Sequence, residues 1–325
     1  MDFRGLDLNH LIALDALLEE KSITRAGERI HLCQSATSGV LAKLREVLSD
    51  KLLVQVGHEM MLTPRAEELI TPVKELLLQV QVLVDKTPGF VPKASKRKFR
   101  IVLSDYIETI LIPQVARRIE REAPSVSLEL LPICDTAHQL LEQGKTEFLI
   151  APASEPSALH PSETLLEDDY VCAVWSENPL IGQSISLEQY LKMGHVGICF
   201  GENRSKSWDE VFLRRNGYMR RVEVFATSFS QMPQLLVGSM RIATMHRRLA
   251  NYFQQYLPLT VRDLPVQMPH LVEKLQWHQC RDQDPGCLWF REVLRQEVAS
   301  LGGARNLPYG IGSRLQERSF TDAVQ

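Results

Sequence analysis

The sequence lacks the features that mark most membrane proteins, secreted proteins and enzymes. No apolar run reaches the ~18 residues that span a bilayer, and the first residues, with an acid at Asp2, contain no signal-peptide core. The 6 cysteines form no Cys-x-x-Cys pair, which excludes the usual zinc ribbons and predicts reduced thiols in a cytoplasmic protein. Neither a Gly-x-Gly-x-x-Gly loop, a Walker sequence nor a Gly-x-Ser-x-Gly elbow is present. We therefore predict no enzyme, no cofactor, no metal site and no membrane partner.

What the sequence does contain is typical of a globular protein with more than one domain. Its 325 residues exceed the ~150 of an average domain, and 44% of them are hydrophobic. The 37 Lys and Arg residues nearly balance the 40 Asp and Glu residues, for a formal net charge of -3. Overall charge gives no sign of nucleic-acid binding, so any such function has to be argued from local patches.

The first 65 residues have the pattern of three short helices followed by a hairpin. Apolar residues recur at helical spacing from Leu8 to Leu18, Ser22 is a natural N-cap for a second helix, and a third helix spans Gln34 to Val47. We expect Ala36 to face inward on the third helix, and the outward face to be polar. Alternation over residues 52–62 predicts a β-hairpin wing. This order fits a winged helix-turn-helix whose third helix enters the major groove, and fits a small bundle with a solvated face equally well.

The same residues carry a resemblance to a known family. Residues 22–38 and 62–66 are similar to the winged helix-turn-helix of LysR-type transcriptional regulators. Residues 63–67 resemble the nodulation-regulator (NodD-like) branch, which includes regulators of chlorinated-aromatic degradation. The matching residues are Ser22, Thr24, Ala26, Gln34, Ala36, Ser38, Leu62 and Thr63. The resemblance implies double-stranded promoter DNA, a small aromatic effector and RNA polymerase as partners, and a homodimer or homotetramer.

With this resemblance, the polar face of the third helix becomes a candidate DNA-binding site. Amides and hydroxyls near a helix N-terminus reach base edges, and cations hold phosphates. We expect base readout by Gln34, Ser35 and Ser38, with phosphate contacts from Thr37, Lys43, Arg45 and Arg65. Ser22, Thr24 and the wing residue His58 complete the candidate set.

Several departures from the family pattern predict modest DNA affinity. Cys33 replaces the usual capping Ser, Ser35 replaces Pro, and the wing contains no Arg. Residues 1–65 hold eight Lys or Arg and nine Asp or Glu, counted along the sequence, so the domain is not basic. Since phosphate contacts dominate affinity for DNA, we expect binding to depend on dimerisation.

A long helix is predicted to follow, with a hinge after it. Pro64 suits a first helical position, and the helix is expected to continue from there until the breaker at Pro88. Leu69, Val73, Leu76, Val80 and Leu83 follow a 4-3-4-3 spacing, which predicts a seam for a partner helix. The alternative is one amphipathic helix lying on its own core. We assign residues 1–63 to the winged helix-turn-helix, 64–87 to a dimerising linker helix and 88–98 to the hinge.

From Phe99 onward, short apolar runs alternate with helical stretches, which predicts an α/β domain with mainly parallel sheets. One helix is expected over residues 107–121. The chain as a whole is thus a multidomain α+β protein. The resemblance implies a periplasmic-binding-protein-like (type 2) effector domain, residues 99–301. Its subdomain I is expected at 99–165 and 268–301, its subdomain II at 166–267, and a tail at 302–325. Arginine pairs at 214–215 and 220–221 fit solvated helix ends or inter-subunit ion pairs.

Open α/β sheets bind ligands where strands end, so the loops that follow the strands supply the candidate effector site. Its residues are Ser104, Asp105, Tyr106, Asp135, Thr136, Ala153, Phe200, Gly201, Glu202, Thr227, Met245 and His246. Acids at three of these loops would repel a carboxylate unless Arg204 or His246 compensates. We therefore predict a neutral phenolic effector. The rival interpretation is an aromatic-binding α/β protein or enzyme whose N-terminal helices serve only dimerisation.

Overall fold

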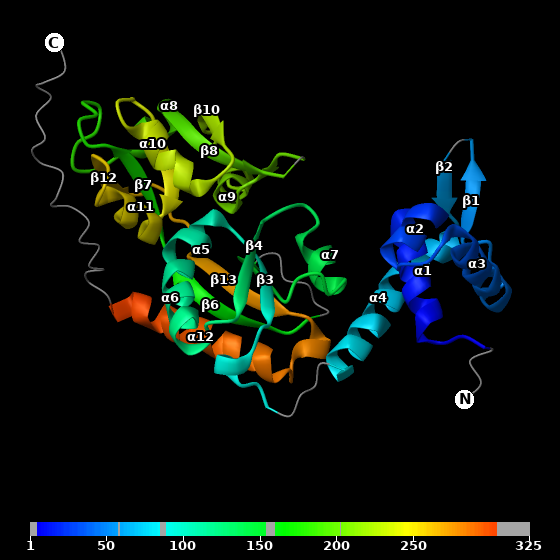
Figure 1. Ribbon diagram of the computed structural model, residues 1–325. Coiled ribbons are helices and arrows are strands. Elements are labelled where there is room, and N and C mark those ends of the chain that lie inside the picture. Colours follow the sequence, from blue (N-terminus) through cyan, green and yellow to red (C-terminus); the bar gives the residue numbers. More distant parts are fainter. Residues whose placement is uncertain (1–4, 58, 85–88, 154–159, 202, 304–325) are drawn as a thin grey trace, which may run out of the picture.

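The computed structural model describes residues 5–57, 59–84, 89–153, 160–201 and 203–303. The N-terminal head (residues 5–62) lies at one end, and a long helix connects it to a larger C-terminal domain built on two sheets (Figure 1). No helix among these residues is long and apolar enough to cross a membrane. Residues 302 and 303 of the predicted tail (302–325) are the end of the last helix rather than tail, and the rest of it lies outside the described residues, as do His58 and Glu202.

The head consists of three helices and an antiparallel hairpin. Its elements are α1 (Leu8–Glu20), α2 (Ile23–Arg29), α3 (Gln34–Leu48), β1 (Leu53–Val56) and β2 (Glu59–Leu62). Ser22 caps α2 as predicted, its Oγ accepting from the Arg25 N–H at 3.4 Å. Cys33 stands at the N-cap of α3 without a side-chain capping bond, as expected for a thiol. The head core is aliphatic, with Leu14, Leu17, Leu41, Leu44, Leu52 and Leu53 buried.

Helix α4 (Pro64–Val84) begins where Thr63 Oγ1 accepts from the Ala66 N–H at 3.1 Å. Its predicted apolar stripe is divided between two surroundings. Val73 is buried, and Leu69, Ile70 and Leu77 pack on the head core. Leu76, Leu83 and Val84 are 43%, 69% and 76% exposed. One side of α4 thus completes the head, while the other leaves an apolar strip that the described residues do not cover.

Two lobes make up the C-terminal domain. Lobe I (residues 98–168 and 271–303) has the strand order β4-β3-β5-β13-β6. Its strands are β3 (Lys98–Leu103), β4 (Ser127–Pro132), β5 (Phe148–Pro152), β6 (Ser162–Asp168) and β13 (Leu271–Trp277). Its helices are α5 (Asp105–Ile110), α6 (Ile112–Glu122), α7 (Ala137–Glu142), η3 (Gln279–Arg281) and α12 (Pro285–Gly303), and the short turn η1 (Pro92–Ala94) precedes it. Phe290 of α12 stacks on Phe99 with ring centroids 4.6 Å apart, which ties this last helix to the lobe I core.

Lobe II (residues 170–263) repeats this architecture, with the strand order β10-β8-β11-β7-β12 and β9 paired to β8. Its strands are β7 (Tyr170–Trp175), β8 (Gly194–Phe200), β9 (Ser205–Lys206), β10 (Arg221–Ala226), β11 (Ile242–His246) and β12 (Leu259–Asp263). Its helices are α8 (Leu187–Lys192), α9 (Trp208–Arg215), η2 (Phe229–Gln231), α10 (Met232–Leu236) and α11 (Arg247–Gln254).

The prediction of mainly parallel sheets was wrong. In lobe I, β3 pairs in parallel with β4 and β5, but β13 pairs antiparallel with both β5 and β6. Lobe II shows the same division, because β7 pairs antiparallel with β11 and β12. The antiparallel strands flank the two places where the chain crosses between the lobes. Strands β7 and β13 enter their sheets directly from the other lobe, without the crossover helix that parallel neighbours need, and each pairs antiparallel with both of its neighbours.

Other boundaries also differ from the expectation. The helix expected over residues 107–121 is two helices, α5 and α6, that meet at Leu111, and Pro113 lies in the first turn of α6. Strand β6 was not predicted, and it continues to Asp168, so the first crossing lies at Asp169 rather than near residue 165. The return crossing lies between β12 and β13, around the expected residue 268.

Candidate DNA-reading helix and effector cavity

Helix α3 presents a small polar surface to solvent. Gln34, Ser35 and Ser38 are exposed on its first two turns, as expected for residues that read base edges. Thr24 of α2 is exposed as well, whereas Ser22 is half-buried because its hydroxyl caps α2. The hydrogen bond with Ser35 lowers the pKa of the exposed Cys33 thiol, whose Sγ lies 3.2 Å from Ser35 Oγ. The exposed end of α3 is therefore rich in hydroxyl and amide groups.

Two residues of α3 face the opposite way from the expectation. Thr37, expected near a phosphate, is 0% exposed, and its Oγ1 donates to the Cys33 carbonyl at 3.1 Å. Ala36, expected inside, is exposed. Gly27 explains the difference, because a Cβ at that position would lie 2.7 Å from both Thr37 Oγ1 and the Leu32 carbonyl oxygen. The glycine lets α2 lie against the Thr37 side of α3, which turns Ala36 outward.

The candidate phosphate-binding cations already have partners inside the head. Arg45 is half-buried and donates to the carbonyls of Lys51 and Leu53 at 2.7 and 2.9 Å, so it fastens the wing to α3. Lys43 lies 3.5 Å from Glu46, and Arg65 lies 2.9 Å from Glu68. Lys43 and Arg65 make ion pairs of the exposed kind, which are weak enough to exchange for phosphate. Arg45 is better described as a residue that positions the wing.

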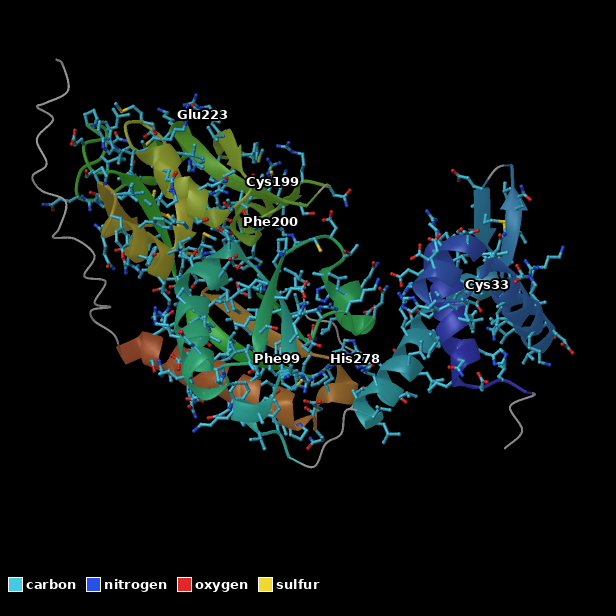
Figure 2. The ribbon with its side chains drawn as sticks, in the orientation of Figure 1. Cys33, Phe99, Cys199, Phe200, Glu223 and His278 are labelled. Carbon is cyan, nitrogen blue, oxygen red and sulfur yellow. The ribbon has the colours of Figure 1, made fainter. Side chains whose placement is uncertain are left out.

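A cavity of about 280 Å³ lies between the two lobes. Its walls come from the ends of strands in lobe I and from aromatic residues of lobe II. They include Ser104, Ile133, Cys134, Asp135, His138, Ile150, Ala151, Pro152, Tyr170, Phe200, Ser205, Lys206, Ser207, Trp208, Asp209, Phe229, His246, Leu271 and Glu273. Figure 2 shows Phe200 where the lobes face each other, far from Cys33 on the head.

Of the candidate effector residues, the structure places Ser104, Asp135, Phe200 and His246 on the cavity wall. The remaining described candidates lie elsewhere: Asp105, Tyr106, Thr136, Ala153, Gly201, Thr227 and Met245. Met245 is fully buried in the core because side chains alternate along β11 and its neighbour His246 takes the cavity side. Arg204 is exposed and lies over the Phe225 ring at 5.8 Å, so it does not compensate the acids of the cavity.

Sequence reasoning found Phe200 but missed the other aromatic residues of the cavity, Tyr170, Trp208 and Phe229. Tyr170 stacks on Trp208 with ring centroids 5.6 Å apart, and Phe229 lies next to Phe200 at the same centroid separation of 5.6 Å. Tyr170 and Trp208 are the first residues of β7 and α9. The search for ends of strands passed over both, because they stand at the beginnings of elements. Aromatic residues that follow an acid or a serine at the start of an element were the available signal.

His246 stands among three aromatic rings. Its ring centroid lies 4.1 Å from Tyr106, 4.6 Å from Phe229 and 5.2 Å from Tyr170. Burial lowers the pKa of His246 to about 3, so the imidazole is neutral at physiological pH. Its Nδ1 is buried without a hydrogen-bond partner in the described part of the chain. A neutral imidazole offers one donor and one acceptor to a bound ligand.

Two carboxylates of lobe I reach across to lobe II. Asp105 accepts from the backbone N–H groups of Phe229 and Ser230 at 3.0 and 2.7 Å. Asp135 accepts from Asn203 Nδ2 at 2.9 Å and from Ser205 Oγ at 3.0 Å. The exposed N–H groups that begin a helix are a ready anion site, and here the protein's own carboxylate occupies those at η2. Asp105 is therefore a clamp between the lobes rather than part of the cavity wall.

Comparisons with known proteins agree with this architecture. The family described as "Bacterial regulatory helix-turn-helix protein, lysR family" matches residues 8–67, and "LysR substrate binding domain" matches residues 93–299. Nodulation protein D 1 of Rhizobium leguminosarum bv. phaseoli is 42% identical over 316 residues, which cover 97% of this chain and 99% of that protein. Nodulation protein D 1 of Mesorhizobium japonicum is 40% identical over 311 residues, 95% of this chain and 99% of that protein.

Solved structures show the same fold. A probable transcriptional regulator from Pseudomonas aeruginosa is 26% identical, with a TM-score of 0.62 over 90% of this chain and 97% of that chain. Full-length CbnR complexed with its target DNA is 14% identical, with a TM-score of 0.57 over 91% of this chain and 100% of that chain, and so supports the fold alone. These relatives are regulators, which favours the prediction of no enzymatic activity over the enzyme alternative. With its helix-turn-helix, its two-lobed domain and relatives along most of its length, the chain belongs to the LysR family of ligand-responsive transcriptional regulators, in the branch of the nodulation D proteins.

Proposed function

We propose that this regulator responds to a neutral phenolic effector bound in the cavity between the lobes. The charge of the cavity wall carries the proposal. Asp135, Asp209 and Glu273 line it, and Lys206 is the single Lys or Arg among the described lining residues. Asp209 is paired with Arg220 behind the wall, so the balance at the cavity is Asp135 and Glu273 against Lys206. The N–H groups of η2, which would suit a carboxylate, are already taken by Asp105. A carboxylated ligand would therefore meet more negative than positive charge.

The aromatic wall favours a flat ring. Tyr170, Trp208, Phe200 and Phe229 offer ring faces and edges of the kind that bind aromatic ligands through apolar area and offset stacking. The neutral imidazole of His246 supplies a hydrogen-bonding group for a phenolic hydroxyl without adding charge. Apolar area with few polar groups is the usual chemistry of a small-molecule site.

Calorimetry with a matched ligand pair tests this proposal. Hydroquinone and 4-hydroxybenzoate share a ring with one hydroxyl and differ only at the opposite position, which carries a second hydroxyl in hydroquinone and a carboxylate in 4-hydroxybenzoate. We expect the phenol to bind at least about tenfold more tightly, a difference of ~1.4 kcal/mol. Trp208→Leu should weaken phenol binding, whereas Phe225→Leu, a 42% exposed aromatic outside the cavity wall, should not. Tighter binding of the acid, or equal effects of the two substitutions, would contradict the proposal.

For DNA, we propose that α3 reads a pseudo-palindromic promoter site through Gln34, Ser35 and Ser38. The exposure of all three residues supports this role, and the pairing of Lys43 with Glu46 leaves Lys43 able to exchange onto a phosphate. Gln34→Ala should lower affinity for the specific site and leave random duplex binding unchanged. Lys43→Ala should weaken binding to both and reduce the salt slope by about 1. Gel shifts with a specific and a scrambled fragment at two salt concentrations separate these roles.

We further propose that two or four copies bind the promoter together. The uncovered strip on α4, with Leu76, Leu83 and Val84, supplies an apolar surface that a second α4 would bury. RNA polymerase as a partner is proposed on the family resemblance alone.

A further inference from the structure

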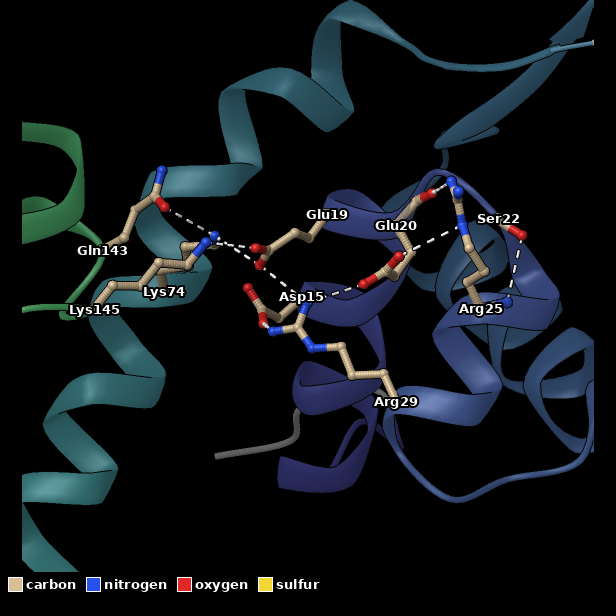
Figure 3. Close-up of polar contacts among 9 residues, drawn as sticks. All are labelled: Asp15, Glu19, Glu20, Ser22, Arg25, Arg29, Lys74, Gln143 and Lys145. Atoms are coloured by element: carbon tan, nitrogen blue, oxygen red, sulfur yellow. Dashed lines mark hydrogen bonds and ion pairs between the residues drawn. The ribbon is translucent and has the colours of Figure 1, made fainter. Parts of the chain in front are cut away.

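The turn between α7 and β5, residues 143–147, contacts the head and the linker helix. Lys145 Nζ donates to Glu19 Oε1 of α1 at 2.5 Å, and Lys74 Nζ of α4 donates to Gln143 Oε1 at 3.3 Å (Figure 3). Glu19, Lys74 and Lys145 come from the head, the linker helix and lobe I. We call these contacts of Glu19, Lys74 and Lys145 the junction. Through them, a movement of lobe I would displace the DNA-reading head directly.

Glu19 holds the junction together because one carboxylate serves three cations. Its Oε2 lies 3.0 Å from Lys74 Nζ and 3.0 Å from an Arg29 nitrogen, while its Oε1 accepts from Lys145. Burial alone would raise the pKa of Glu19, but the hydrogen bonds from Lys145, Lys74 and Arg29 lower it to about 2. Lys74 is 8% exposed, so this part of the network is largely withdrawn from solvent. Lys145 is half-buried and is the one cation of the three that belongs to the C-terminal domain.

The turn at residues 143–147 also packs closely against α4. Gly144 has a φ of +65°, and a Cβ there would lie 2.8 Å from Leu78 Cδ2, closer than real side chains approach. Leu78 is 7% exposed. Gly144 therefore allows the turn to contact α4, because it has no side chain and readily adopts this backbone conformation.

The other end of α7 belongs to the effector cavity. Cys134 and Asp135 stand just before Thr136, the N-cap of the helix, and line the cavity, and so does His138 in the first turn of the helix. The Nδ1 of His138 is buried without a hydrogen-bond partner in the described part of the chain. Asp135 is bonded to Asn203 and Ser205 of lobe II, so this end also senses the position of that lobe.

Helix α7 is short and well anchored, which makes it a stiff connection. Its six residues extend about 9 Å at ~1.5 Å per residue. Ala137 and Leu141 are buried against Val102 and Leu149 of the lobe I sheet. A helix held in this way transmits a displacement from one end to the other rather than absorbing it, because packed interiors are not continuously deformable.

We propose that α7 couples the effector cavity to the DNA-reading head: a ligand contacting Asp135 and His138 displaces α7 and changes the Lys145–Glu19 contact at its far end. The effector part of this inference rests on the proposed function of the cavity. The effector then changes the population of head positions by favouring one position of α7, as any ligand with unequal affinity for two states must.

Carbodiimide cross-linking measures the contact directly, because it joins a lysine amine to a carboxylate that it touches. In the full-length protein, the Lys145–Glu19 product is quantified by mass spectrometry with and without hydroquinone. The Lys192–Glu188 pair within α8, 2.7 Å apart and exposed, provides the internal standard. We expect the Lys145–Glu19 yield to change about fivefold, the lower end of usual allosteric coupling, with the standard constant. An unchanged ratio in protein that binds hydroquinone by calorimetry would overturn the inference.

Lys145→Gln, with Lys192→Gln as its matched control, links the contact to regulation. Both variants should bind hydroquinone within twofold of the unsubstituted protein. Lys145→Gln should lose most of the hydroquinone-induced change in promoter affinity, and Lys192→Gln should keep it. Equal responses of the two variants would refute the coupling.

A second experiment tests the coupling without ligand. If hydroquinone fails to bind at all, the proposed effector class is wrong, but the coupling can still be tested in this way. Asp135→Ala, which frees the cavity end of α7 from lobe II, must then change the Lys145–Glu19 yield; an unchanged yield would refute the coupling too.

Discussion

Among the arginines of lobe II, Arg220 is the one whose substitution should lower the free energy of unfolding most, because its guanidinium is buried. Arg220 is one of four arginines that were expected at solvated helix ends or in inter-subunit ion pairs, yet its side chain is 1% exposed and is paired within its own lobe. It donates to Asp209 Oδ2 at 2.9 Å and to Glu210 Oε2 at 2.5 Å, and both carboxylates are buried. Arg220→Met keeps much of the side-chain length and leaves the two acids without their shared partner.

The magnitude follows from the burial. Breaking a buried ion pair by removing one partner costs about 3–5 kcal/mol, because the remaining charge stays desolvated. For a domain of 150–250 residues each kcal/mol lowers the melting temperature by roughly 2–4 °C, so Tm should fall by roughly 6–20 °C. Arg214→Met is the matched control. Arg214 also contacts Glu210, at 2.5 Å, but is 42% exposed, and exposed pairs contribute about 0–1 kcal/mol.

The way the stability loss of Arg220→Met changes with pH is a second, independent test. Burial on its own would raise the pKa of Glu210, but Arg214 and Arg220 hold it below its usual value in the folded protein. A group with a lowered folded pKa stabilises the fold above its unfolded pKa of about 4.3, and that stability is lost as the pH falls further. In Arg220→Met, Arg214 is the only one of these two cations left to lower the pKa of Glu210, so the effect of burial raises that pKa. Protonation of the buried acids at lower pH then removes their unpaired charge. The deficit of the variant should therefore shrink between pH 7.5 and pH 5.

Calorimetric melting of the full-length protein at both pH values measures these quantities. A Tm loss for Arg220→Met no larger than that for Arg214→Met would refute the argument from burial. A deficit that grows as the pH falls would refute the argument from desolvated carboxylates.

Three further substitutions test other parts of the structure. Asp105→Asn removes the charge that fills the η2 N–H groups, so the preference for hydroquinone over 4-hydroxybenzoate in calorimetry should fall by about tenfold, ~1.4 kcal/mol. An unchanged preference would show that this carboxylate does not select the ligand. Leu83→Glu, at a 69% exposed position, should shift sedimentation toward smaller species without lowering Tm; intact oligomers would exclude this strip from the interface. Thr37→Val removes the bond to the Cys33 carbonyl and should lower head stability by about 1 kcal/mol in chemical unfolding, while the ratio of specific to random DNA binding stays constant. A loss of sequence discrimination would instead return Thr37 to the DNA surface.

How far the sequence predicts this molecule depends on whether a feature is local. The order of the head elements, the Ser22 cap and most helices of the C-terminal domain follow from periodicity and capping within a few residues. The inversion of Ala36 and Thr37 does not, because it depends on the space left by Gly27 in another helix. Periodicity describes one helix at a time and contains no information on how closely its neighbour approaches.

The effector cavity shows the same division. Strand ends led to Ser104, Asp135, Phe200 and His246, since the carboxyl ends of strands converge in such sheets. Asp105 was expected at the ligand, but its carboxylate is used between the lobes, a contact over 124 positions of sequence. Whether a carboxylate such as that of Asp105 lines the cavity or bonds across the two lobes depends on how the lobes lie against each other. A local sequence pattern contains no information on that arrangement.

The partners of the head cations show why a small shift at the junction would be enough to regulate DNA binding. Arg29, Lys43, Arg45 and Arg65 all have hydrogen-bond or ion-pair partners inside the chain, so a phosphate contact from any of these four has to replace one. We therefore expect a single head to bind weakly, so that useful affinity depends on two heads engaging at once. The second binding event is then governed by effective concentration, which falls steeply when the geometry no longer matches the site. Under that condition, a contact as modest as Lys145–Glu19 controls affinity through the position of the head, and the bound DNA need touch neither residue.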